Sequence, residues 1–220
     1  MGMNFNFLTN GKFVYFLQGA KWTLIISLAS VALGVIFGTI LTILKRSKFK
    51  VIRFIASAYI EIVRGTPLLL QIFIVYYGLA NVVKINEVFA VILALSLNSG
   101  AYVSELIRAG IEAVDKGQME AARSLGMNEG LAMRKIVIPQ AIKNILPAIG
   151  NEFVAIIKES SMASTLGVAE LMYGAKVVSA GSFNYVETLI MSAVFYFIMT
   201  FSLGRLIKYI ERRLKVSDSN

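Results

Sequence analysis

Polar side chains interrupt the apolar stretches of this 220-residue chain at positions where they could bind a ligand. They are Gln71, the adjacent Asn98 and Ser99, and Glu152. Amides, hydroxyls and a carboxylate gathered at one level would suit an ammonium or guanidinium group. We therefore expect Asn98, Ser99 and Glu152 to contact a substrate. For Gln71, a hydrogen bond between packed helices is an equal alternative.

Two hydroxyl side chains, Ser160 and Ser161, follow the last of these stretches and could add contacts near its outer end. The chain has no histidine and no cysteine. This excludes thiolate nucleophiles, disulfides and the commonest general base and metal ligand. We expect no catalytic residue, no metal site and no cofactor in this chain.

The composition places the chain in the membrane class. It is 57% hydrophobic and only 16% charged, with a mean hydropathy of +0.71. The N-terminus lacks a basic region followed by an apolar core and a cleavage site, so the first apolar run is predicted to remain as an anchor. Backbone groups in lipid must be satisfied internally, which favours an all-α bundle, and we predict one membrane domain over residues 1–220.

The apolar runs predict five transmembrane helices, since about 20 residues cross the hydrocarbon. Their expected ranges are 20–44, 51–82, 88–112, 140–158 and 186–210. The second is expected to bend near Pro67. Half of the hydrocarbon is roughly ten helical residues deep, which places Gln71, Asn98–Ser99 and Glu152 near the middle of their helices.

Basic residues predict the orientation. Sixteen of the 22 Lys and Arg residues fall on one side of the predicted helices and five on the other. By the positive-inside rule, the N-terminus is outside and the C-terminus cytoplasmic. The net charge of +9 therefore reports topology, and we expect no nucleic-acid partner.

The segment 117–138, between the third and fourth helices, is then cytoplasmic. It is rich in helix-forming residues. Glu120, Ala121 and Ala122 lie on its first helix, where the small alanine side chains allow close approach of another surface. Gly126 suits a sharp turn, because glycine tolerates a positive φ. A second short helix leads through Ile136 to Pro139. The residues alone leave two alternatives, a docking surface or a solvated connector.

The pattern Glu120–Ala121–Ala122, Gly126, Ile136 and Ile138–Pro139 resembles the cytoplasmic EAA signature of ABC importer permeases. Ile138 replaces the usual leucine, which conserves volume. The stretches 61–71, 99–122 and 158–171 are similar to permeases of the polar amino acid family, which takes up histidine, glutamine, arginine or opines. The likeness covers most of residues 22–212.

This resemblance implies a type I ABC importer transmembrane fold in a prokaryotic cell (inner) membrane. It implies that 117–138 is a coupling helix seated in a separate dimeric ATPase, which would hold ATP and Mg²⁺. This chain has no phosphate-binding loop of its own. A second permease, identical or similar, and an extracellular or periplasmic amino acid-binding protein are the other expected partners. The expected function is uptake of polar, basic amino acids by alternating access.

Two other functions are weighed against this one. A stand-alone gradient-driven carrier would need Glu152 or Glu105 as its coupling site, and it would leave the elaborate cytoplasmic segment without a purpose. A membrane scaffold docking a partner through 117–138 would leave the polar groups in the membrane unexplained.

Two further features bear on the architecture. Gly34 and Gly38 predict a close helix contact, either within the chain or between subunits. The outer segment 159–187 is punctuated by glycine and is expected to form an amphipathic helix at the outer surface, with or without a gating role.

Overall fold

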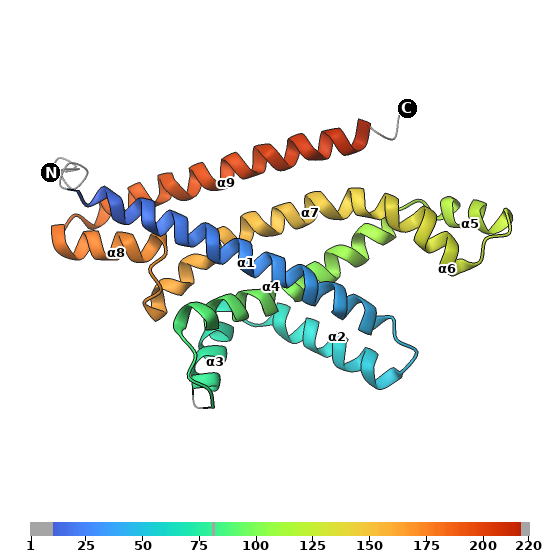
Figure 1. The fold of residues 1–220 in the computed structure, drawn as a ribbon, viewed down its shortest axis with the longest axis horizontal. Coiled ribbons are helices and arrows are strands. Elements are labelled where there is room, and N and C mark those ends of the chain that lie inside the picture. Colours follow the sequence, from blue (N-terminus) through green and yellow to red (C-terminus); the bar gives the residue numbers. More distant parts are fainter. Residues whose placement is uncertain (1–10, 81, 217–220) are drawn as a thin grey trace.

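The computed structural model describes residues 11–80 and 82–216, and every regular element in them is helical (Figure 1). The predicted all-α fold is confirmed. In chain order the elements are α1 (Phe13–Lys45), α2 (Lys50–Gly65), α3 (Leu68–Ala80), α4 (Glu87–Glu112), α5 (Lys116–Ser124), α6 (Glu129–Ala132), a π-helix (Met133–Val137), α7 (Ile138–Glu159), a 3-10 helix (Ser160–Leu166), α8 (Leu171–Ser182) and α9 (Tyr185–Val216).

Three helices of the described chain, α1, α4 and α9, are long and apolar enough to cross a membrane. The bent pair α2 and α3 raises the number to four if it counts as one span. The helix α7 has 22 residues but is less apolar than these. The structure thus offers three to four candidate spans, and the fifth span remains a prediction.

The predicted helix over 51–82 is broken at Pro67. The axes of α2 and α3 differ by 113°, and the break spans Thr66 and Pro67. Thr66 has extended dihedral angles, φ −120° and ψ 150°, as expected for a residue that precedes proline. The bend predicted at Pro67 is therefore present, but it is a sharp corner and not a kink within one continuous helix.

Small residues bring α1 and α4 into close contact. A Cβ added at Gly38 would lie 2.7 Å from Val103 Cβ and 2.8 Å from the Gly100 carbonyl oxygen. At Gly34, it would lie 2.8 Å from both Cβ and Oγ of Ser99. The glycines of α1 therefore make a helix contact within the chain. Because no side chain separates the two backbones, Ser99 is held at a fixed place beside α1.

The main apolar core lies between α1, α3, α4 and α7. Its fully buried members include Ile26, Ile72, Leu95 and Ile156. Each of the last three is within four residues of a predicted site residue on the same helix. Side chains in close-packed surroundings hold one conformation, so this core positions the polar groups beside it.

The outer segment forms a packed helix. Glu170 is fully buried at the N-cap of α8, where its carboxylate accepts hydrogen bonds from the backbone N–H groups of Met172 and Tyr173, both at 2.9 Å. It also accepts from the Tyr196 hydroxyl of α9 at 2.8 Å and from the Thr23 hydroxyl of α1 at 3.5 Å. Burial raises the pKa of Glu170, and these hydrogen bonds oppose the rise. The carboxylate thus ties α8 to α1 and α9.

The two ends of the molecule differ in character. Figure 1 shows α8 beside the described start of α1 at one end, with α5 and α6 at the opposite end. The segments expected outside and in the cytoplasm are therefore separated by the length of the bundle.

Candidate functional site

A polar cluster joins α3 and α4 within the bundle. Asn98 is only 4% exposed, and its side-chain amide donates a hydrogen bond of 2.9 Å to the Gln71 carbonyl oxygen Oε1. Ser99, the next residue on α4, is fully buried. The structure thus brings together three of the side chains that the sequence predicts at one level.

The amide of Gln71 also closes the corner between α2 and α3. Its Nε2 group donates to the backbone oxygens of Val63 at 2.7 Å and Thr66 at 3.1 Å, and it lies 2.9 Å from the Thr66 hydroxyl. The terminal carbonyls of a helix need such partners. Of the two interpretations left open for Gln71, these contacts favour the structural one, with both ends of the amide used within the protein.

Glu152 supplies the acidic group of the cluster from α7. Its half-buried side chain lies close enough to Ser99 to interact with that buried hydroxyl. No hydrogen bond of ordinary length reaches the Ser99 oxygen. No Lys or Arg of the described ranges 11–80 and 82–216 makes an ion pair with Glu152. A carboxylate in these surroundings needs a cation, and a ligand could supply it.

The two serines after Glu152 lie away from this cluster. Ser160 is fully buried, and its hydroxyl donates to the Ile157 carbonyl at 2.8 Å. The Ser161 hydroxyl donates to the Lys158 carbonyl at 2.7 Å. Ser160 is eight residues beyond Glu152, or about 12 Å along a helix. Ser160 and Ser161 therefore lie beyond the end of α7, apart from the central group, and their contact with a substrate stays a prediction.

The second candidate site is the helical turn at the far end of the bundle. The Asp115 carboxylate caps α5 by accepting a hydrogen bond of 2.7 Å from the Gly117 N–H. After α5, Gly126 has φ +85°, the conformation that its place in the sequence predicts. The Met127 N–H donates to the Ala122 carbonyl at 3.2 Å, and the Gly126 N–H to the Arg123 carbonyl at 3.0 Å. This pair of bonds is a Schellman motif, which ends a helix sharply.

The turn presents one face to the surroundings and packs the other on the bundle. Glu120 and Ala121 are exposed and Leu125 is 86% exposed, whereas Ala122 is buried. Ile136 is half-buried in the π-helix, and Pro139 is exposed in the first turn of α7. A small core anchors the segment to α4 and α7; its buried members are Val114, Val137 and Ala141.

An ionic cluster around Glu105 was only partly predictable. The i,i+3 spacing indicates its pair with Arg108, which the structure has at 2.9 Å. Lys45 of α1 approaches the same carboxylate at 2.7 Å, and Arg64 of α2 lies 3.9 Å away. Nothing in the local sequence indicates the last two contacts, because they depend on how the helices pack. Because Lys45, Arg64 and Arg108 already surround its carboxylate, Glu105 is a poor candidate for the ion-coupling site that a gradient-driven carrier would need.

Tyr59 is a further contact that sequence patterns did not indicate. Its hydroxyl donates to the Leu97 carbonyl at 3.0 Å and so links α2 to α4 one residue before Asn98. No motif marks this tyrosine, and only the packing of the two helices reveals its role in holding the polar cluster.

Comparison with known proteins gives one consistent result. The chain matches the family described as "binding-protein-dependent transport system inner membrane component" over residues 12–216. It is 42% identical to the arginine transport system permease protein ArtQ of Bacillus subtilis, covering 98% of this chain and 100% of the relative. It is also 42% identical to a putative glutamine transport system permease protein GlnP of Rickettsia prowazekii, with 94% and 95% covered.

A solved structure agrees with these matches. A chain from the crystal structure of an amino acid ABC transporter with histidines superposes with a TM-score of 0.91 at 45% identity, and 97% of this chain and 100% of that chain are covered. The resemblance to ABC importer permeases of the amino acid type is thus confirmed, together with the type I importer fold. The chain belongs to the family of binding-protein-dependent transport system inner membrane components, the membrane-embedded and non-catalytic subunits of ABC importers.

Proposed function

We propose that this chain is the permease subunit of an importer for basic amino acids, driven by ATP hydrolysis in a separate subunit. The observation that carries the proposal is the Glu152 carboxylate, which lies beside the buried Ser99 hydroxyl with no cation of the described protein paired to it. A guanidinium or side-chain ammonium would supply the missing positive charge. The proposal includes five spans, with the N-terminus outside and the C-terminus in the cytoplasm.

The relatives support an amino acid as the substrate. Their names specify arginine in one case and glutamine in another. Both side chains carry planar N–H groups, but only arginine carries a charge. The unpaired carboxylate at Glu152 favours the charged substrate. The neutral amide of Asn98, already bonded to Gln71, would help to orient the ligand through its remaining carbonyl oxygen.

The cytoplasmic turn would connect transport to ATP hydrolysis. The exposed residues Glu120, Ala121 and Leu125 form the surface that would seat in a cleft of the ATPase. Beyond the turn at Gly126, the chain is helical without a break from Glu129 through the π-helix into α7, which carries Glu152, and the small core around Val137 and Ala141 packs α5 against this helix. Glu152 is 14 residues from the start of α7, or about 21 Å along the helix. Closure of the ATPase dimer around ATP and Mg²⁺ would therefore move the docking surface and the carboxylate as one body.

The transport cycle follows from this connection. One chain cannot enclose a symmetric pathway over a dimeric ATPase, so a second permease, identical or similar, completes it. ATP-driven closure opens the cavity outward to receive the amino acid from an extracellular or periplasmic binding protein. Hydrolysis and product release return the cavity to the cytoplasm. The setting is the prokaryotic inner membrane.

The experiment that tests the proposal is reconstitution of the permease with its co-purifying subunits in liposomes, with uptake of labelled arginine as the readout. We expect uptake only with ATP and the binding protein. Gly126→Val should detach or uncouple the ATPase, because a β-branched residue does not tolerate φ +85°. The control is Gly130→Ala, where the nearest atom to an added Cβ is 3.7 Å away.

Three outcomes would overturn the proposal. Arginine uptake by the chain alone, driven by a proton or sodium gradient, would make it a carrier. Normal ATPase binding and uptake by the Gly126→Val permease would mean that the turn is not the coupling surface. A permease that binds an ATPase-like partner but moves no solute would support the scaffold alternative.

A further inference from the structure

A long apolar groove runs along the outside of α1, α4 and α7. Its volume is about 570 Å³, and aliphatic side chains line most of it. They include Val35 and Ile43 of α1, Ile111 of α4, and Ile142 and Ile149 of α7. The groove is separate from the polar cluster around Glu152, and neither the transport cycle nor the coupling surface uses it.

A cationic pocket of about 210 Å³ opens at one end of this groove. The two hollows share Thr42, Arg46 and Ile111, so they are continuous. The pocket adds Lys45, Arg108, Ser104 and the carboxylate of Glu112 to its lining. Three cations and one carboxylate line the pocket, and the Glu105 carboxylate beside it pairs with two of those cations, so three positive charges against two negative ones leave an excess of one positive charge.

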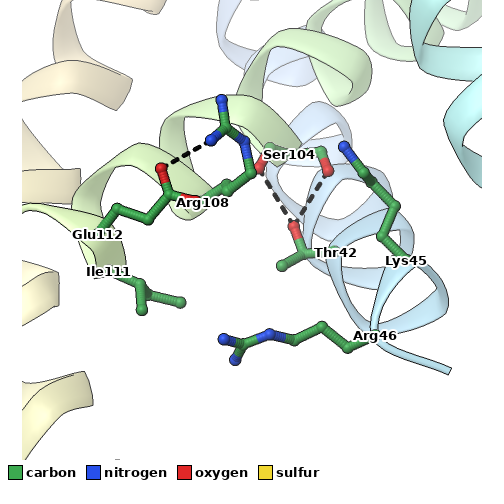
Figure 2. Close-up of a pocket in the computed structure, with 7 residues that line it drawn as sticks. All are labelled: Thr42, Lys45, Arg46, Ser104, Arg108, Ile111 and Glu112. Carbon is green, nitrogen blue, oxygen red and sulfur yellow. Dashed lines mark hydrogen bonds and ion pairs between the residues drawn. The ribbon is translucent and has the colours of Figure 1, made fainter. Parts of the chain in front are cut away.

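The cations of the pocket are not equally satisfied. Lys45 pairs with Glu105 at 2.7 Å, and Arg108 pairs with Glu105 at 2.9 Å and with Glu112 at 2.7 Å. Arg46 makes no side-chain hydrogen bond or ion pair within the described ranges, although it lines the same pocket. Figure 2 shows its guanidinium extended across the opening toward Ile111, away from the paired side chains. Arg46 is the group that lacks a counter-ion.

The dimensions of the groove match one leaflet of a membrane. Arg46 directly follows the last residue of α1, a helix long and apolar enough to cross a bilayer. Val35 lies eleven residues earlier, or about 16 Å along the helix axis, and half of the hydrocarbon is roughly 15 Å thick. A cation thus lies where the head groups begin, and the apolar lining extends from it to mid-membrane.

The geometry points to a binding site for one anionic phospholipid, with its phosphate at Arg46, Lys45 and Arg108 and an acyl chain along the groove. Charge and shape together select this ligand. A free phosphate would match the pocket but leave the groove unfilled, and a zwitterionic lipid would fill the groove but offset the pocket's charge less well. The lipid would neutralise Arg46 and cover the seam between α1 and α7. The lipid would lie in the leaflet at the α5 end of the molecule, because the pocket is lined by the last turns of α4, which lead directly to α5.

The test is lipid titration of the delipidated permease, purified with its co-isolated subunits and measured by native mass spectrometry. The probes are phosphatidylglycerol and phosphatidylcholine with identical acyl chains. We expect phosphatidylglycerol to bind at least about tenfold more tightly. Arg46→Gln should remove most of this difference, as expected for the loss of a charge-assisted hydrogen bond. Arg53→Gln is the matched control, since Arg53 is exposed on α2 and does not line the groove.

A second variant separates the groove from the pocket. Ile142→Trp should weaken both lipids, because Ile142 lines the groove and is 45% exposed, so a larger side chain can occupy the space without disturbing the core. Equal losses from Arg46→Gln and Arg53→Gln would overturn the proposal in favour of nonspecific attraction. Inorganic phosphate binding that depends on Arg46, with lipid binding unaffected by Ile142→Trp, would identify an anion site only. Cross-linking of Ile142→Cys to a second permease would show that protein covers the groove.

Discussion

Replacing Glu152 by glutamine removes one charge and leaves the size of the side chain unchanged. Because no cation of the described protein pairs with this carboxylate, the change breaks no internal ion pair, and folding should be preserved. The effect should therefore fall on the ligand. Glutamine keeps a carbonyl oxygen that can accept a hydrogen bond, so only the charge component of the interaction is lost.

The expected magnitude follows from the surroundings of Glu152. At an effective dielectric constant near 20, two unit charges 3 Å apart attract by about 5.5 kcal/mol. Desolvation of both groups offsets much of this, and hydrogen bonds to charged groups contribute about 1.5–3 kcal/mol net. Since about 1.4 kcal/mol corresponds to a factor of ten, we expect arginine uptake at low concentration to fall by roughly 10- to 100-fold. Glutamine transport should change by less than about threefold.

The assay is competitive uptake into liposomes that contain the permease, its ATPase and the binding protein, with labelled arginine and glutamine supplied separately. Glu61→Gln is the control, since it removes an exposed carboxylate from α2. Equal losses for both substrates would refute a charge-specific contact and leave Glu152 with a structural role. An unchanged arginine rate would show that the cation is recognised elsewhere, in the binding protein or at the second permease.

Two other predictions concern the integrity of the bundle. Glu170→Ala should lower the free energy of unfolding by about 3 kcal/mol, because it leaves buried backbone N–H donors without an acceptor. The thermal inactivation midpoint in detergent should fall by roughly 5–10 °C. An unchanged midpoint would contradict the capping role. The chain has no cysteine of its own, so disulfides can be introduced between its helices. We expect two such disulfides to leave ATP-driven uptake within about twofold of the reduced protein. One joins α1 to α4 through Thr42→Cys and Ser104→Cys, and the other joins α4 to α7 through Gly110→Cys and Ile145→Cys. Loss of uptake reversed by a reductant would show that the helices move within the chain.

Local features of the site were accessible from the sequence. Gly126 is placed where a helix must end, and its positive φ follows from the conformational freedom of glycine. The common level of Asn98, Ser99 and Glu152 follows from counting residues inward from the ends of apolar runs, since each helical residue has a fixed rise. These predictions needed only the geometry of single helices.

Contacts between helices were not accessible in the same way. Proline at 67 indicates a break, but the 113° angle depends on how Gln71 joins the end of α2 to Asn98 of α4. The cap on α8 unites Glu170 with Thr23, 147 residues away in the sequence. A single sequence has no periodicity that reports such pairings.

The contacts within the chain indicate where the transport motion takes place. Glycines bring α1 against α4, the Asn98–Gln71 bond joins α3 to α4, and the small core at Ala141 joins α4, the cytoplasmic turn and α7. Packed interiors resist small deformations, so these helices should move as one rigid body. Alternation of the pathway would then come from rotation of one permease against the other, and Glu152 would change its exposure without changing its neighbours. For this reason both intrachain disulfides are expected to be harmless, although they cross the same helices that carry the substrate and coupling sites.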